Sequence, residues 1–215
     1  MPDTPHAYGL PAQLRAATHR LHVQAERTGM MARIFHKQAT RPGYALLLRN
    51  LLPAYQALEA GLEQHRHTPG VGRFARPEAY RAATLLADLE ALGGNALPLL
   101  PSGQLYADCV TRAAQGDGAG LIGHTYTRTL GDLSGGQIMP RLLSKSLDLG
   151  EAELGFYRFA AIEDIALYKA GYHADIEQAE AEITNAAVVI EAAVLAFEMN
   201  IAVSDAVAAW DAGAV

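Results

Sequence analysis

Apolar residues recur at helical spacing along most of the chain. Near the start, the apolar positions Leu10, Leu14, Ala17 and Leu21 follow one helix face at i, i+4, i+7 and i+11. We predict this helix and further helices over about 42–64, 76–92, 103–115, 119–147, 151–159, 161–183 and 185–210. The pattern contains no strand hairpin, fixed-period repeat or low-complexity linker. We therefore expect an all-α fold, a single domain over residues 1–215 with flexible ends at about 1–9 and 211–215.

Two of these helices have unusual sequences. Pro53 lies inside the helix predicted over 42–64 and should kink or divide it. The last helix is strongly apolar, but Glu191 and Glu198 interrupt it, whereas a bilayer span needs about 20 predominantly apolar residues. We interpret it as a buried core helix. Because the N-terminus also lacks the basic start and apolar run of a signal peptide, we expect a cytoplasmic protein without a membrane anchor.

Charge and cysteine content exclude several functional classes. The chain of 215 residues carries a net charge of −6, so it is not built to bind nucleic acid. Its single cysteine, Cys109, excludes a disulfide framework or a cysteine metal site within one chain and suits a reducing compartment.

The stretch YTRTLGDLSGGQIM at 126–139 breaks the helical pattern with three glycines. Each glycine inside a helix costs about 1 kcal/mol relative to alanine, so we expect a compensating role. Gly131 and Gly135 share a helix face, and close packing of two helices would account for them. That hypothesis does not account for Gly136 or Asp132. The other hypothesis is a helix that bends over a flat ligand, with its backbone against the ligand and the carboxylate organising water.

The first helix carries a candidate ligand for a metal held in such a flat molecule. His22 lies beside the apolar face, and Glu26 at i+4 could support its other ring nitrogen, directly or through water. Arg15 lies two turns earlier on the same face, near enough to meet an anionic group. His19, one turn away, is the competing ligand.

Together these stretches resemble heme oxygenases. The resemblance rests on LRAATHRLHVQAE near the start, AYQALE at 54–59 and GHTYTRTLGDLSGGQIM at 123–139, in the family's order and spacing. It extends over about residues 10–205, and LGDLSGGQ is its most specific part. It implies a helical heme oxygenase-like fold with heme between a proximal helix and a glycine-kinked distal helix. The chain length resembles that of the soluble bacterial forms.

The resemblance also implies roles for the matching residues. His22 corresponds to the iron ligand and Glu26 to its supporting carboxylate. Asp132 corresponds to an aspartate that holds a distal water network. The other residues implied in the catalytic network are Gly131, Gly135, Arg128, Tyr55, Tyr106 and Asn200. The other residues implied to contact heme are Arg15, Tyr126, Ser134, Gly136, Lys169, His173 and Phe197, besides Gly131 and Gly135.

One position departs from the family pattern. His173 falls where the family often has an arginine near a heme propionate. A histidine is shorter and is neutral when deprotonated, so heme would be pinned less firmly. The carbon of the ring that is attacked therefore stays open.

The implied reaction is the oxidation of heme b by O2 and electrons from an external donor to biliverdin, carbon monoxide and ferrous iron. The reaction would serve iron release, bilin supply or both. A ferredoxin, flavodoxin or reductase would supply the electrons, and Arg15, Arg20 and Arg112 could form a basic rim for an acidic donor. A bilin-accepting protein is a further possible partner, and we expect a monomer.

Two other functional classes stay open. A non-catalytic heme-binding or heme-transfer protein would keep His22 but would not need Asp132 and the glycines. An interaction protein without a cofactor would account for the helices alone. We interpret His124 as a structural residue near the network.

Overall fold

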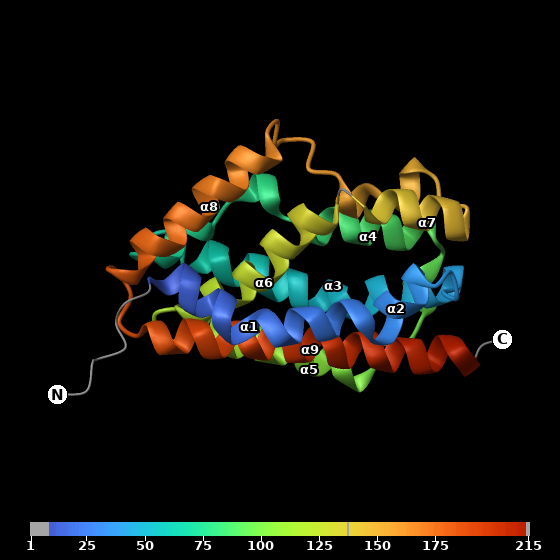
Figure 1. Cartoon of the computed structure of the whole chain (residues 1–215), viewed down its shortest axis with the longest axis horizontal. Coiled ribbons are helices and arrows are strands. Elements are labelled where there is room, and N and C mark those ends of the chain that lie inside the picture. Colours follow the sequence, from blue (N-terminus) through green and yellow to red (C-terminus); the bar gives the residue numbers. More distant parts are fainter. Residues whose placement is uncertain (1–8, 137, 214–215) are drawn as a thin grey trace.

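The computed structural model describes residues 9–136 and 138–213, and these contain helices and no strand (Figure 1). The α-helices are α1 (Leu10–Arg27), α2 (Gly29–Phe35), α3 (Arg41–Gln64), α4 (Ala82–Ala91), α5 (Pro101–Ala113), α6 (Gly120–Gly135), α7 (Met139–Leu147), α8 (Ile165–Glu180) and α9 (Ala186–Gly213). Short 3-10 helices join them: η1 (Val71–Phe74), η2 (Pro77–Ala79), η3 (Gly94–Ala96), η4 (Glu151–Glu153) and η5 (Gly155–Tyr157). The predicted all-α fold class is confirmed.

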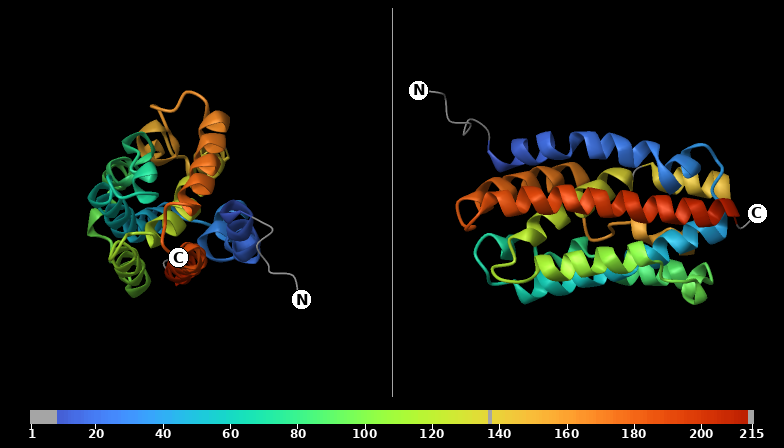
Figure 2. Two further views of the ribbon diagram at one scale, coloured as in Figure 1. Left: turned by 90° about the vertical axis from the view of Figure 1, so that its left-hand side faces the viewer. Right: turned by 90° about the horizontal axis from the view of Figure 1, so that it is seen from below.

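Helix α9 contacts more than half of the other α-helices. It packs against α1, α2, α3, α5 and α6, and Figure 2 shows α1 and α9 side by side along their length. By length and composition alone α9 could also cross a membrane. Val189, Ala193, Val203 and Val207 of α9 are fully buried, whereas 33% of its apolar window as a whole is buried, so part of this helix belongs to the core.

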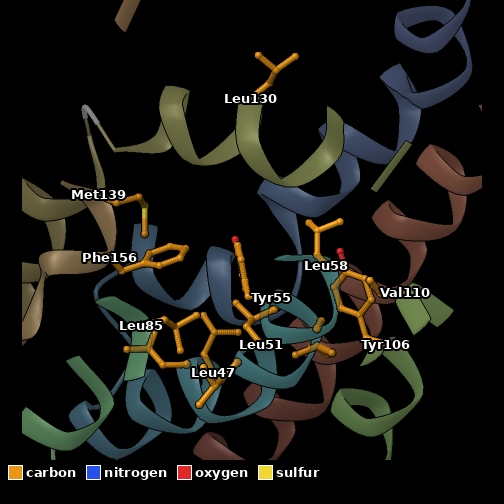
Figure 3. Close-up of a cluster of buried hydrophobic side chains, with 14 of the residues drawn as sticks. Leu47, Leu51, Tyr55, Leu58, Leu85, Tyr106, Val110, Leu130, Met139 and Phe156 are labelled. Carbon is orange, nitrogen blue, oxygen red and sulfur yellow. The ribbon is translucent and has the colours of Figure 1, made fainter. Parts of the chain in front are cut away.

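Helix α3 forms the centre of the core. Its side chains meet residues of α4, α5 and η5, including Leu85, Val110 and Phe156 (Figure 3). Of the two effects predicted for Pro53, a kink or a division of the helix, the division is wrong, because α3 runs unbroken from Arg41 to Gln64. Proline costs a helix interior about 3 kcal/mol. The buried residues on both sides of it, such as Leu52 and Ala54, supply packing that outweighs this cost.

Helix α4 begins later than predicted. The segment over 76–92 starts as η2, turns at Tyr80 and Arg81, and becomes α-helical at Ala82. The carboxylate of Glu59 on α3 accepts hydrogen bonds from the backbone N–H groups of Arg81, at 2.5 Å, and Ala82, at 2.8 Å. The cap of this helix therefore comes from another helix, and the local sequence carries no sign of it.

Other boundaries differ for local reasons. The predicted helix over 119–147 is two helices, because α6 ends at its glycines and α7 begins at Met139. The segment over 151–159 forms the two 3-10 turns η4 and η5, and α2 was not predicted. On α1, the predicted apolar position Ala17 is exposed and Thr18 is buried instead. The Thr18 hydroxyl can be buried because it donates to the carbonyl of Leu14.

The predicted flexible ends fall largely outside the described residues, which exclude 1–8, 137 and 214–215. At the C-terminal end, Asp211 belongs to the range predicted to be flexible, which stays a prediction. Its side chain is fully buried in α9 and accepts hydrogen bonds from Arg33 Nε, at 2.9 Å, and from Thr40. These bonds fix the end of α9 against the start of α3.

Candidate active site

A cavity of about 840 Å³ lies between α1 and α6, with α9, α3, α2 and α8 completing its walls. This volume is within the range of about 300–1,000 Å³ typical of small-molecule and cofactor sites. Most of the residues expected to contact heme line it: Arg15, His22, Glu26, Tyr126, Gly131, Ser134, Gly135, Lys169, His173 and Phe197. Asp132, Arg128 and Asn200 line it as well.

The α1 wall carries both candidate histidines. His19 and His22 line the cavity, and the side chain of His22 is 56% exposed because it faces this open space. The ring of Phe197 on α9 contacts the His22 ring edge-on, with centroids 5.9 Å apart. The nearest atoms of His22 and Glu26, Nε2 and Oε1, are 3.8 Å apart, too far for a hydrogen bond. His22 therefore differs from His19 in having Phe197 and Glu26 as neighbours. Any hydrogen bond between Glu26 and the His22 ring would pass through a water molecule.

The α6 wall presents bare backbone to the cavity. A methyl group added at Gly131 would meet nothing within 4 Å, and one at Gly135 would meet only Met139 Cγ, at 3.8 Å. The alternative of close helix packing does not explain these two glycines. That role belongs to Gly123, where a methyl group would lie 2.3 Å from the carbonyl oxygen of Val189 on α9.

Gly136 has a different setting from the other two glycines. It is not among the residues that line the cavity, and a methyl group there would lie 2.9 Å from the carbonyl oxygen of Tyr157. Its N–H donates to the carbonyl of Asp132 at 2.8 Å, which closes the last turn of α6. Gly136 thus allows η5 to approach the end of this helix.

Asp132 is the centre of a buried polar cluster on α6. Tyr55 points from α3 towards α6 (Figure 3), and its hydroxyl donates to Asp132 Oδ2 at 2.6 Å. Arg128 donates through Nη2 to Asp132 Oδ1 at 3.1 Å, through Nε to the Tyr55 hydroxyl at 2.8 Å, and through Nη1 to Asn200 Oδ1 at 2.5 Å. Burial raises the pKa of Asp132, whereas Arg128 and Tyr55 oppose this shift. The cluster therefore holds a carboxyl group whose pKa lies above its ordinary value.

Tyr106 lies beside this cluster. Its hydroxyl and both ring nitrogens of His124 have no hydrogen-bond partner within the described residues, and the two rings lie 6.1 Å apart. Burial raises the pKa of Tyr106 to about 12 and lowers the pKa of His124 to about 4, so both are neutral near pH 7. Neither residue lines the large cavity.

Cationic side chains stand on the α1 and α8 sides of the cavity. Lys169 Nζ donates to the hydroxyl of Ser134 at 2.7 Å, which connects α8 to α6. Burial, followed by the charge of Lys169, lowers the pKa of His173, so this ring is neutral near pH 7. Arg15 lines the cavity, but Arg20 and Arg112 do not, and Arg112 instead contacts the sulfur of Cys109.

Apart from Phe197, the sequence did not identify the apolar residues of the cavity. Met31, Phe35, Leu51, Ile138 and Phe156 line it, and Phe35 and Ile138 are 44% and 56% exposed because they face this space. These residues come from four different segments, so no local pattern joins them. The one local signal was Ile138, an apolar residue two positions after Gly136.

The arrangement fits the heme that the sequence resemblance implies. One wall offers an imidazole, a common iron ligand. The opposite wall offers side-chain-free backbone where a flat ring can lie close. The apolar residues suit a porphyrin, and Arg15 and Lys169 suit its propionates.

Comparisons with known proteins agree with this geometry. The sequence profile of the heme oxygenase family matches residues 9–206. The chain is 34% identical over 200 residues to a heme oxygenase of Takifugu rubripes, covering 90% of this chain and 72% of that protein. It is 30% identical over 196 residues to heme oxygenase 1 of Nostoc sp., covering 89% and 82%. Heme oxygenase-1 of Synechocystis sp. PCC6803, solved in complex with heme, superposes with a TM-score of 0.87 at 29% identity and 96% coverage of both chains. The chain therefore belongs to the heme oxygenase family of heme-degrading enzymes.

Proposed function

We propose that this protein converts heme b, O2 and electrons from an external donor into biliverdin, carbon monoxide and ferrous iron. The observation that carries this proposal is the cavity in which His22 faces a glycine-lined wall with Asp132 beside it. Heme, when bound, supplies both the iron at which O2 is activated and the porphyrin carbon that is oxidised. The residues of this chain bind it, orient it, and control water and protons around it.

His22 would bind the iron of heme. The edge of the Phe197 ring fixes its orientation, and a water held by Glu26 would bond the ring nitrogen that does not face the metal. A neutral imidazole in this position suits oxygen binding and lacks the strong electron push of a thiolate.

Gly131 and Gly135 would shape the oxygen side of the site. Without side chains, the backbone of α6 can lie against the porphyrin and restrict the direction in which a small ligand bends. A methyl group at either position would project into the space that the ring and the oxygen need.

Asp132 would hold a water on that side and move a proton through it. Tyr55 and Arg128 fix the orientation of the carboxyl group, and Asn200 fixes Arg128. Burial raises the pKa of Asp132 above its ordinary value, which makes the protonated form easier to reach, and the group would exchange protons with this water. Tyr106 would add a hydroxyl at the edge of this network.

Arg15, Lys169 and Tyr126 would meet the propionates and set the rotation of heme in its plane. Ser134 holds the Lys169 ammonium group across the cavity. Burial and Lys169 lower the pKa of His173 in the heme-free protein, and the ring would offer a hydrogen bond to a propionate. The selectivity for one ring carbon would therefore depend mostly on Arg15 and Lys169.

A heme carrier is the second candidate, and the buried Asp132 cluster argues against it. A carrier needs an iron ligand and a pocket for heme. Burying the carboxyl group of Asp132 costs free energy, and heme binding alone does not require that group.

For the enzyme, a ferredoxin, flavodoxin or reductase would serve as electron donor. The protein would act as a cytoplasmic monomer, and a bilin-accepting protein could receive the product.

An absorption time course tests this proposal. Purified protein is loaded with hemin in air and given a reductase system or ascorbate, with catalase present. The expected result is loss of the Soret band and growth of the broad red absorption of biliverdin, whose isomer is then identified by chromatography. Histidine-ligated heme that stays intact with a competent donor would identify a carrier.

A further inference from the structure

A second, much smaller cavity lies on the other side of α6. Its volume is about 20 Å³, enough for one water molecule. Its polar lining includes Glu59 of α3, Arg81 beside α4, Thr129 and Asp132 of α6, and Tyr172 of α8. A buried water needs two to four polar partners, and this lining supplies them.

Asp132 lines both cavities, and the two share no other lining residue in the described part of the chain. Each of its carboxylate oxygens accepts one bond from the protein, Oδ2 from Tyr55 and Oδ1 from Arg128. A carboxylate has about four lone-pair sites, so further acceptor positions are open. Asp132 can therefore bond water on the heme side and on the opposite side of α6.

Glu59 connects the small cavity to solvent. It lies one turn after Tyr55 on α3, is partly exposed, and also lines this cavity. Its Oε1 takes the N–H groups of Arg81 and Ala82, while Oε2 takes no donor among the described residues. Burial raises the pKa of Glu59, which makes its protonated form easier to reach. The group thus has one oxygen held in place and one available to a water.

The guanidinium group of Arg81 provides a positive charge near the carboxyl groups of Glu59 and Asp132. The Arg81 side chain is held by the carbonyls of Tyr80, at 2.6 Å, and Arg158, at 2.5 Å. Although burial lowers the pKa of Arg81, Asp132 and Glu59 are the two groups that most oppose this shift. Besides the two carboxyl groups, the charged and titratable groups that face this space are Tyr55, Arg76, Tyr80, Arg81 and Tyr172. Arg81 therefore stabilises a negative charge on either carboxyl group.

We propose that one water in this small cavity joins Glu59 to Asp132, and that Glu59 relays protons from solvent to Asp132 from the side of α6 opposite heme. Glu59 gives its proton to the water, the water gives one of its own to Asp132, Asp132 passes a proton to the water on the heme side, and solvent protonates Glu59 again. No electron moves, and each group returns to its starting state. Glu59 is a relay residue that acts through Asp132, so the inference rests on the proposed role of Asp132.

The test uses the full chain with Glu59→Gln, because the amide oxygen can still accept from Arg81 and Ala82. Heme binding and folding should be unchanged, whereas heme consumption should slow by about tenfold or more and its solvent isotope effect should grow. Glu63→Gln, the same change one turn later on an exposed part of α3, is the matched control and should match wild type. A normal rate and isotope effect in a folded, heme-binding Glu59→Gln protein would overturn the proposal.

Two measurements do not depend on the reaction. A high-resolution crystal structure should place a water within hydrogen-bond distance of Glu59 and Asp132, and Thr129→Val should weaken or remove it; a dry cavity in wild type would overturn the relay. Infrared titration of the heme-free protein should show a carboxylic acid band that Glu59→Gln removes.

Asp132→Asn separates the relay proposed for Glu59 from the role proposed for Asp132. If it blocks biliverdin formation while Glu59→Gln does not, only the relay fails; if neither matters, the role of Asp132 fails too.

Discussion

The hydroxyl of Tyr55 donates a 2.6 Å hydrogen bond to Asp132 and accepts one from Arg128, so a side chain of α3 sets the position of a carboxyl group on α6. This contact joins the centre of the core to the wall of the cavity. It also holds the carboxyl group that we propose exchanges protons in a buried position, because Asp132 is 6% exposed.

Tyr55→Phe tests this contact. Removing the hydroxyl leaves the charges of Asp132 and Arg128 less satisfied, so we expect a loss of about 1–3 kcal/mol in the free energy of unfolding. The pKa of Asp132 should rise further, because the bond from Tyr55 lowers it. Urea unfolding and infrared titration measure the two effects. Tyr80→Phe, which removes a hydroxyl bonded to the exposed Glu63, is the control and should cost less. Equal losses would argue against a special role for Tyr55.

Gly131→Ala and Gly136→Ala should have different effects on the free energy of unfolding and on hemin binding. Gly131→Ala adds a methyl group that meets nothing, so the heme-free protein should gain about 0.5–1 kcal/mol in helix stability. The same methyl group projects into the cavity, so hemin should bind more weakly in a spectroscopic titration. Gly136→Ala should instead destabilise the heme-free protein, because its methyl group would meet the Tyr157 carbonyl. Unchanged hemin affinity in Gly131→Ala would show that heme does not lie against this face.

His22→Ala tests the assignment of the iron ligand. The ferrous heme complex should lose its histidine-type absorption spectrum, and added imidazole should restore it by filling the space. His19→Ala is the matched control on the same wall and should keep the spectrum. If instead the spectrum survives in His22→Ala and disappears in His19→Ala, the competing histidine is the ligand.

His124 should make stability depend on pH. Its pKa in the folded protein is about 4, below the ordinary value near 6.5, because burial disfavours the charged ring. The unfolded chain therefore binds more protons between these values, so stability is fully present above about pH 6.5 and is lost as pH falls towards 4. At pH 5 the loss from this group should be about 2 kcal/mol relative to pH 7. Urea unfolding at both pH values should show a smaller difference for His124→Gln, and an equal difference would contradict the shift.

The sequence predicted the features that depend on residues close together in the chain. It did not predict those that depend on contacts between distant segments. The glycine spacing and Asp132 indicated a ligand-facing helix because they lie within one turn or two of each other. His22 and Glu26 were found for the same reason. The start of α4 was missed because its cap is Glu59, a residue of α3 that is distant in sequence. The continuous α3 was missed because burial on both sides of Pro53 outweighs a local penalty. The apolar part of the cavity was missed because its residues meet only in the folded chain.

The most direct test of the central claim is a product balance in a single turnover with hemin, O2 and a reductase, carried out with wild type and Asp132→Asn. We predict that wild type releases one biliverdin, one carbon monoxide and one ferrous iron for each heme consumed. Asp132→Asn should bind heme with the same histidine-type spectrum and release little biliverdin or carbon monoxide. Intact heme in wild type, or the same product yield from both proteins, would contradict the account.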